Sequence, residues 1–406
     1  MDTFLKLYGE AAVTSLGFFW KSAWAFILGY GISAMIQAFV PKSRMTPFMG
    51  DDNARSISLA TAFGAISSSC SFAALSTARA LFAKGAHFIA AVAFMFASTN
   101  LVIELGILIV IFLGWPFLAA EIVGGLLLIL ISSLLIRLTM PRGLIDAARK
   151  RIQAAQSGEE DFDWRKRVRS ADGWRLVGHR FVAEWEMVWE EILIGFTVAG
   201  FMAVLVPPSF WDAIFLAGGG HGLPQWLVVV ENALVAPFVA AATFIGSMGN
   251  IPLATVLNAN GVLFAGIMAF IYSDLMVPPL VMINARYYGW RLALYIAAIM
   301  FVSIVATALL VHYGLAALDI TPESARRVGD VVRFAIDYTF YLNIMFALVA
   351  AALAWLMRQH RRGGGHGGMD HSMAGSSKLK RSAAWLAAAI LAGGLAASAV
   401  SSAAIG

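Results

Sequence analysis

Long apolar runs without a charged side chain decide what this chain can fold into, and two of them are 124–135 and 292–311. About twenty such residues, coiled as a helix, cross the hydrocarbon core of a bilayer. The whole chain follows this pattern, because 60% of its 406 residues are hydrophobic and only 13% are charged. The short alternating strands of a transmembrane barrel are not evident. We therefore predict an all-α polytopic membrane protein.

The apolar runs divide the chain into full spans and two interrupted segments, 57–83 and 228–259. The predicted full spans are 16–40, 86–113, 115–137, 187–207, 262–284, 290–313, 336–357 and 383–405. The expected regions are a first transmembrane repeat (1–137), a basic loop (138–186), a second transmembrane repeat (187–313), an additional span (314–357), a linker (358–382) and a C-terminal span (383–406). Residues 1–15 contain acids and no basic n-region, so they are predicted to be a retained amphipathic lead-in.

The two interrupted segments read as copies of one another. Subtracting 176 from the second copy places Gly261 on Gly85 and Asp274 on Ser98. Each copy is apolar and is broken midway by small, polar or helix-breaking residues. Matching interruptions in two halves of a polytopic protein indicate a transporter's binding site.

Basic residues set the expected topology. The loops 140–180 and 358–381 are both rich in Lys and Arg, which is typical of cytoplasmic loops. Both loops lie on the same side only if 228–259 is a re-entrant hairpin rather than a full crossing. The same treatment of 57–83 places the N-terminus outside. We therefore predict two inverted repeats, each with one re-entrant helical hairpin, in a fold of about eight full spans plus two hairpins.

The tips of the two hairpins are the predicted substrate site. A break in a helix exposes N–H groups and a dipole that favour anions or electron-rich atoms, and Pro252 suits the first turn of a new helix. Cys70 and Met248 would add one soft sulfur to each tip. The alternative is that small residues only allow close helix packing. The candidate residues are Ser69, Cys70, Ser71, Ser247, Met248, Gly249, Asn250 and Pro252.

Polar side chains inside predicted spans form a second group of candidates. An ionisable residue within a span is costly and indicates function, so Glu104 and Asp274 are candidates for proton coupling. Asn100 and Asn258 would complete a polar pathway with them. The alternative is that these groups form structural hydrogen bonds between helices. Residues near predicted span ends are expected to extend to the membrane interface and carry no role; these are Lys21, Glu121, Glu186, Glu190 and Glu191.

These sequences resemble the ArsP/YraQ-type permeases. The resemblance rests on the stretches 64–71, 84–86 and 93–98, and on Gly246, 250–253, 260–261 and 269–270 in the second half. It implies an inner-membrane permease that exports trivalent organoarsenicals or other soft species. The family's first tip commonly reads Pro-Phe-Cys-Ser-Cys-Gly, whereas this chain has Ser68 at the first Cys position, so a two-thiol site is missing. The residues that carry over are Cys70, Asn250, Pro252 and Gly261.

The linker before the last predicted span is rich in Gly, His and Met. Imidazole and thioether groups suit copper, zinc or nickel, so His366, Met369, His371 and Met373 are candidate metal ligands. The alternative is a solvated linker whose histidines have no role.

Together these features predict a bacterial inner-membrane secondary permease that exports a small soft-element species by alternating access. Its partners would be that substrate and the lipid bilayer, with a homo-oligomer left open. We expect no nucleic acid, because the basic loop suits anionic headgroups. No Walker or Rossmann motif occurs, so no cofactor and no enzymatic activity are expected. The alternatives are a permease for a small anion and a membrane scaffold or enzyme.

Overall fold

A computed structural model gives the fold, and its described residues are helices joined by turns and loops. The described residues are 2–39, 49–67, 71–153, 164–216, 222–243, 246–322, 328–332, 334–362 and 378–403. The first half contains α1 (Asp2–Phe39), α2 (Ala54–Ser67), α3 (Ser71–Ala83), α4 (Phe88–Asn100), α5 (Ile103–Phe112) and α6 (Trp115–Thr139). Two shorter helices, α7 (Arg142–Gln153) and α8 (Trp164–Val168), follow it.

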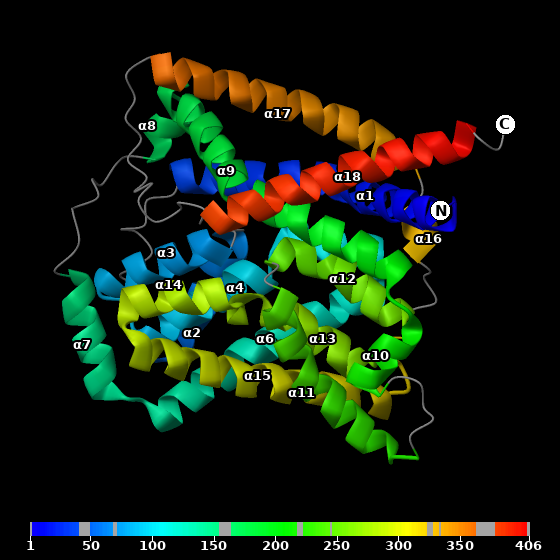
Figure 1. The fold of residues 1–406 in the computed structure, drawn as a ribbon. Helices are drawn as coiled ribbons and strands as arrows, with labels where there is room; N and C mark the ends of the chain where they lie inside the picture. Colours follow the sequence, from blue (N-terminus) through cyan, green and yellow to red (C-terminus); the bar gives the residue numbers. More distant parts are fainter. Residues whose placement is uncertain are drawn as a thin grey trace.

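The second half contains a comparable series of helices with α10 and η3 in addition, and three further helices follow it. It contains α9 (Ala171–Leu205), α10 (Pro208–Phe215), α11 (Gln225–Thr243), α12 (Ser247–Ala259), α13 (Phe264–Tyr272), the 3-10 helix η3 (Ser273–Met276), α14 (Pro278–Tyr288) and α15 (Trp290–Ala317). The last helices are α16 (Val328–Val331), α17 (Tyr338–Arg362) and α18 (Lys378–Ala403). In Figure 1, α1, α9, α17 and α18 form the upper part of the bundle, and α2–α6 and α11–α15 form the lower part.

Glycines with positive φ occur at two corresponding turns in each half of the chain. Gly85 and Gly261, each shortly before α4 or α13, have φ values of +111° and +85°. Gly114 and Gly289 precede α6 and α15 with φ values of 106° and 89°. Glycine adopts such angles without steric cost, whereas other residues rarely do. Equivalent turns therefore occupy equivalent places in both halves, and the inverted orientation of the halves stays a prediction.

Two predicted full spans are not continuous helices. The span 86–113 breaks between α4 and α5, where Val102 is extended at φ −99° and ψ 149°. Just before it, the hydroxyl of Ser98 and the amide of Asn100 bond to backbone carbonyls of their own helix, and such bonds compete with helix continuation. The span 262–284 bends by 41° between η3 and α14. There Val277 precedes Pro278, and a residue before proline is forced out of helical geometry.

Eight helical segments of the described part are long and apolar enough to cross a bilayer, or nine if the bent pair is one span. One of the eight, Gln225–Thr243, is the first arm of the predicted hairpin 228–259. This arm alone is long enough to cross a bilayer, whereas an arm of a re-entrant hairpin can be shorter. Its helix begins three residues earlier than predicted and accommodates Pro237 in its interior. Two others are α18 and α17, and only 6% of the most apolar stretch of α17 is buried inside the structure.

Two helices begin well before their predicted spans. The predicted lead-in 1–15 is the first part of α1, which runs unbroken to Phe39. The predicted basic loop 138–186 holds α7, α8 and the first turns of α9, which starts at Ala171. Ser170 caps α9 by accepting a hydrogen bond from the Gly173 N–H, and this polar cap explains the early start.

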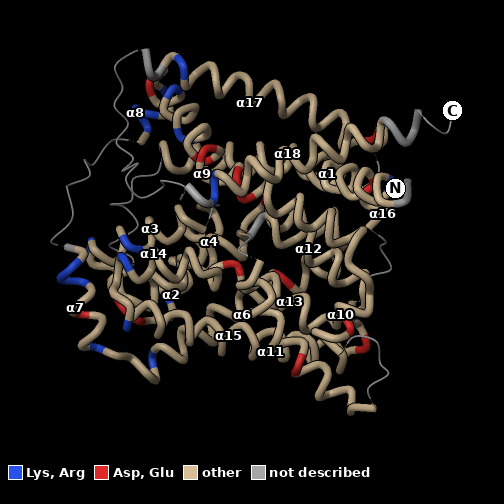
Figure 2. The backbone as a smooth tube through the Cα atoms, in the orientation of Figure 1, with Lys and Arg blue, Asp and Glu red and all other residues tan. Residues whose placement is uncertain are grey.

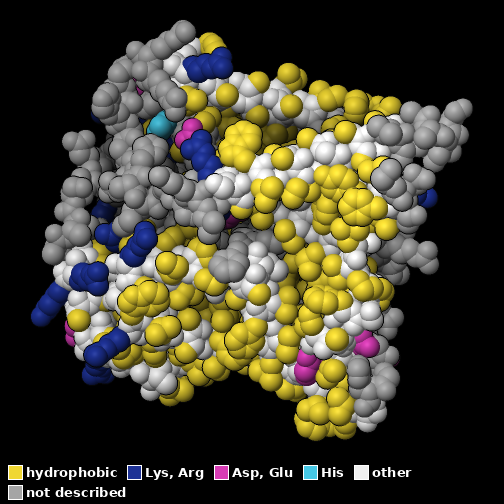
Figure 3. All heavy atoms as spheres, viewed as in Figure 1, with side chains coloured by type: hydrophobic (Ala, Val, Ile, Leu, Met, Phe, Trp, Pro, Cys, Tyr) yellow, Lys and Arg dark blue, Asp and Glu magenta, His cyan; other side chains and the backbone are white. Residues whose placement is uncertain are grey.

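Charge is distributed unevenly along the bundle. Figure 2 shows Lys and Arg concentrated at the end that carries α7 and α8, whereas Asp and Glu also occur in the middle. Apolar side chains cover much of the flank seen in Figure 3, with the basic side chains at that same end. An apolar flank around long helices is the arrangement of a multi-pass membrane protein, and the basic end is the one expected in the cytoplasm.

Candidate functional site

The start of α3, within the first interrupted segment, contacts the second half of the molecule. Ser71 opens α3, and its hydroxyl donates a hydrogen bond of 3.2 Å to Asp274 Oδ2 on η3. The side chain of Thr99 and the backbone N–H of Leu275 also hydrogen-bond to this carboxylate. Asp274 is only 1% exposed, and its Oδ1 has no hydrogen-bond partner. The predicted coupling residue thus lies directly at the first tip.

The second tip is the start of α12. Gly246 caps this helix, and its carbonyl accepts hydrogen bonds from the N–H groups of Gly249 and Asn250 at 3.0 and 3.2 Å. Asn250 is fully buried, yet neither its Oδ1 nor its Nδ2 has a hydrogen-bond partner. Pro252 is buried in the second turn of α12, one turn later than predicted, because the helix already begins at Ser247.

A carboxylate and an amine that the sequence analysis missed connect the two tips. Glu191 of α9 lies against Gly246 so closely that an added Cβ there would collide with its Oε2. Lys380 of α18 forms an ion pair of 2.6 Å with Glu191 Oε1. The same Nζ lies 5.0 Å from the ring centroid of Phe72, the second residue of α3. Lys380 therefore links the two tips, directly at Phe72 and through Glu191 at Gly246.

The other predicted pathway residues are on α4, α5 and α12. Glu104 is fully buried on α5 and packs against α1, where Gly29 has space for no side chain of its own. Asn100 is 3% exposed; its Nδ2 donates to the Phe96 carbonyl at 3.1 Å, and its Oδ1 has no partner. Asn258 lies near the end of α12 with its Nδ2 buried and without a partner.

Several acids that were predicted to extend to the membrane interface are buried instead. Glu121 is 1% exposed and Glu190 is 3% exposed. Glu191 lies in the middle of the 35-residue α9, because that helix begins sixteen residues before the predicted span. Lys21 is also mostly buried and pairs with Asp337 at 2.6 Å. Within this group only Glu186 is exposed.

Part of the predicted site lies outside the described residues. This applies to Ser69, Cys70, His366, Met369, His371 and Met373, and to the side chains of Ser247 and Met248. The sulfur contacts and the metal-binding linker therefore stay predictions. Within the described part of the chain, no three His, Cys, Asp or Glu side chains are grouped so as to hold a metal ion.

The buried polar centre lies at the interruptions of helices and combines groups from both halves of the chain. Its groups lie where helices are interrupted, and irregular backbone at membrane depth is tolerated where protein or a cavity surrounds it. They come from both halves and from α18, so a relative movement of the halves changes the site. A permease fits this arrangement.

Comparison with known proteins agrees with that assignment. Residues 8–313 match the family ArsP_1, described as "Predicted permease". The chain is also similar to the permease Rv2963 of Mycobacterium tuberculosis, with 38% identity over 327 residues, which cover 77% of this chain and 79% of that protein. No solved structure matches the chain. The interrupted helices, the buried polar centre and these matches together place the chain in the ArsP_1 family of membrane permeases.

Proposed function

We propose that this permease resides in the bacterial inner membrane and exports a small soft-element species, either a trivalent organoarsenical or a soft metal ion. The species would bind between the two tips, with Cys70 and Met248 as soft contacts. The permease would work by alternating access between two inverted repeats. The observation that carries this proposal is the meeting of the N-termini of α3 and α12 around buried polar groups.

Asn250 gives the strongest support for a binding role at the second tip. A buried amide without a partner costs roughly 1–3 kcal/mol, and a protein retains such a group where a ligand can satisfy it. Asn250 is fully buried in the first turn of α12 and lacks a partner for both polar atoms. A substrate that hydrogen-bonds to the amide while it contacts sulfur would recover this cost.

Asp274 is the candidate for coupling transport to protons. Its carboxyl group lies in the bundle interior, where an uncompensated charge is costly. The hydroxyl of Ser71 ties it to the first tip. Gain or loss of a proton at this carboxyl would therefore change the bond between the halves, which is what a coupling residue requires. Glu104 and Asn258 would continue the polar pathway.

A small anion is the second candidate substrate. Two helix N-termini of thirteen-residue helices point to the same region, and such termini attract anions. The carboxylates of Asp274 and Glu191 already occupy the places beside these termini. Because like charges repel, this arrangement favours a neutral or cationic substrate over an anion.

Transport into inverted membrane vesicles tests the proposal. Vesicles containing the wild type should accumulate one or more of a trivalent methylarsenical, antimonite, copper or zinc when a proton gradient is applied. Cys70→Ser should reduce accumulation of the thiophilic species and leave that of a hard oxyanion unchanged. Equal fluxes in Cys70→Ser and the wild type for every soft species would overturn the sulfur assignment. Transport of oxyanions alone would favour the second candidate.

A further inference from the structure

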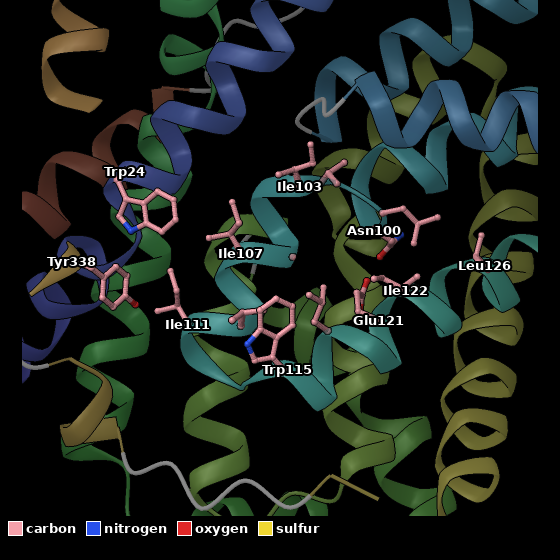
Figure 4. Close-up of a pocket in the computed structure, with 15 residues that line it drawn as sticks. Trp24, Asn100, Ile103, Ile107, Ile111, Trp115, Glu121, Ile122, Leu126 and Tyr338 are labelled. Atoms are coloured by element: carbon pink, nitrogen blue, oxygen red, sulfur yellow. The ribbon is translucent and has the colours of Figure 1, made fainter. Parts of the chain in front are cut away.

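A cavity of about 620 Å³ lies between α1, α5, α6 and the start of α17. Figure 4 shows residues from these elements around it, among them Trp24, Ile107, Trp115, Glu121 and Tyr338. It contains none of the tip residues. Its volume falls within the range of roughly 300–1,000 Å³ that is usual for ligand pockets. The chemistry of its lining determines which molecule it would accept.

The polar end of the cavity consists of acceptor atoms without donors. Glu121 is 1% exposed, and neither of its carboxylate oxygens has a hydrogen-bond partner. Asn100 donates its Nδ2 to the Phe96 carbonyl, which leaves its unpartnered Oδ1 as an acceptor. Figure 4 shows the two side chains close to one another. A molecule that donates hydrogen bonds can satisfy these acceptors, and an acceptor on the same molecule would suit the buried, unpartnered Nε1 of Trp24, which also lines the cavity.

Charge strengthens this requirement. Leaving a buried carboxylate unpaired is strongly destabilising, whereas a cation that reaches it removes the penalty. The charged group that acts on Glu121 electrostatically is the carboxylate of Asp274, which carries the same sign. A cation that reaches Glu121 would stabilise its charged form, because it would offset both the burial of the group and the like charge of Asp274. The polar end of the cavity thus suits a cation with N–H groups.

The rest of the lining is apolar and opens towards the bilayer. Ile107, Ile111 and Leu118 line the cavity together with the rings of Trp24 and Trp115. Trp115 is 70% exposed at its rim, and Tyr338 is 59% exposed. In a membrane, lipid lies against these rim residues. Indole rings also attract cations through their faces. A ligand with an apolar aromatic body can therefore enter laterally from the lipid.

We propose that this cavity is a binding site for an amphipathic organic cation, whose N–H groups meet Glu121 and Asn100 and whose apolar body lies against the Trp24 and Trp115 rings. The site is separate from the tips and goes beyond the export of a soft-element species. A lipid acyl chain is a poorer occupant, because it offers no donor to Glu121.

Ethidium is a suitable probe, since it combines a positive charge, two aromatic amines and a flat apolar body. Its fluorescence is titrated against the purified full-length protein in lipid nanodiscs. We expect saturable binding by the wild type and at least tenfold weaker binding by Glu121→Gln, which keeps the shape of the side chain and removes its charge. Glu231→Gln, a carboxyl group on α11 that does not line the cavity, should bind as the wild type does.

Two further measurements distinguish binding in the cavity from nonspecific binding of an apolar dye. Ile107→Trp fills the cavity and should abolish binding while the carboxylate remains. An uncharged apolar dye of similar size should bind weakly and respond equally to Glu121→Gln and to Glu231→Gln. Unchanged ethidium affinity in Glu121→Gln, or unchanged affinity in Ile107→Trp, would overturn the proposal. Tight, charge-independent binding of the neutral dye would indicate a lipid-binding groove instead.

The test is independent of the proposed transport function. Asn250→Ala changes the second tip and should leave ethidium binding unaltered, because Asn250 does not line the cavity. A failure of soft-element export with intact ethidium binding would affect only the tip proposal. The reverse result would affect only the cavity proposal.

Discussion

The two interrupted segments share a backbone plan but treat their buried polar groups differently. In each, a helix of thirteen residues follows the break, as α3 or α12. At the first tip, Ser71 hydrogen-bonds to Asp274 in the other half. At the second tip, Asn250 is fully buried without a partner, and a carboxylate, Glu191, lies against the capping Gly246.

This difference suggests different tasks for the two tips. The hydrogen bond between Ser71 and Asp274 stabilises one arrangement of the two halves. An unsatisfied buried amide stores a cost that a ligand can remove. We therefore infer that the first tip mainly controls the movement of the halves and that the second tip mainly recognises the substrate. The first three of the following predictions test this division, and the last two test the backbone plan of the halves and a region outside both tips, from the largest expected effect to the smallest.

Asp274→Asn should have the largest effect. It preserves the size of the side chain and the position of an acceptor but removes the exchangeable carboxyl proton. If the first tip couples movement to protons, transport should fall by about 100-fold, on the order of the loss of a proton-transferring group. Vesicle flux driven by a proton gradient measures this. Asp146→Asn on α7, at the basic end of the bundle, is the control; an equal loss there would argue against a specific role.

Lys380→Ala should strongly destabilise the second tip. It leaves the Glu191 side chain, which is only 16% exposed, without its counter-ion. Breaking a partly buried pair in this way should lower the free energy of unfolding by about 2 kcal/mol. Thermal unfolding in detergent measures the change. Arg175→Ala removes an exposed pair with Asp172 and should have almost no effect, and the double variant Lys380→Ala/Glu191→Ala should regain stability.

Asn250→Ala and Ser71→Ala should separate the two tips most directly. Asn250→Ala removes a buried group without a partner, so stability should stay constant or rise while substrate flux falls by about tenfold, the equivalent of one lost hydrogen bond of ~1.4 kcal/mol. Ser71→Ala should instead lower stability by about 1.5 kcal/mol, because a hydrogen bond to a carboxylate is lost. Parallel behaviour of both variants would refute the division of tasks.

Gly85→Ala and Gly261→Ala test whether the two halves share one backbone plan. Both positions have positive φ, so an added Cβ should cost about 1–2 kcal/mol in each. We expect the two losses in melting stability to be similar. Gly143 of α7 has open space around it, and Gly143→Ala should be neutral or slightly stabilising. A large difference between the paired variants would show that the turns are not equivalent.

The smallest expected effect lies outside both tips, at Asp337. The hydrogen bond from Lys21 holds the pKa of Asp337 below its ordinary value. A group with a lowered folded-state pKa stabilises the protein above its unfolded pKa, near 3.9, and this contribution is lost as the pH falls further. Because the Asp337 side chain is 31% exposed and solvent screens its pair with Lys21, the effect should be below about 1 kcal/mol. Unfolding between pH 6 and pH 3, compared with Asp337→Asn, measures it.

Part of this architecture could be predicted from the sequence because it depends on local chemistry. The turn glycines at 85 and 261 recur at a fixed offset, and apolar runs indicate spans regardless of tertiary contacts. The two prolines after Val277 are a local signal for the bend there, although 262–284 was predicted as one span. The break before Val102 was not, because no glycine or proline marks it and its cause is the pattern of side-chain bonds around Asn100.

The connection between the tips could not be predicted at all. Glu191 and Lys380 are 189 residues apart, and each lay near an expected span end, where charged residues usually have no role. Only the early start of α9 and the packing of α18 bring them to the centre. A single sequence contains no local signal for such a long-range pair.

Lys380 has one more consequence, because it belongs to a helix beyond the family-matching region 8–313. A relative that kept both interrupted segments but lacked this terminal helix would have a bare carboxylate at its second tip. Such a protein would require another cation there, either from its own chain or from its cargo. Exchanging the terminal helix between relatives would thus redirect what the rest of the bundle carries, without a single change inside it.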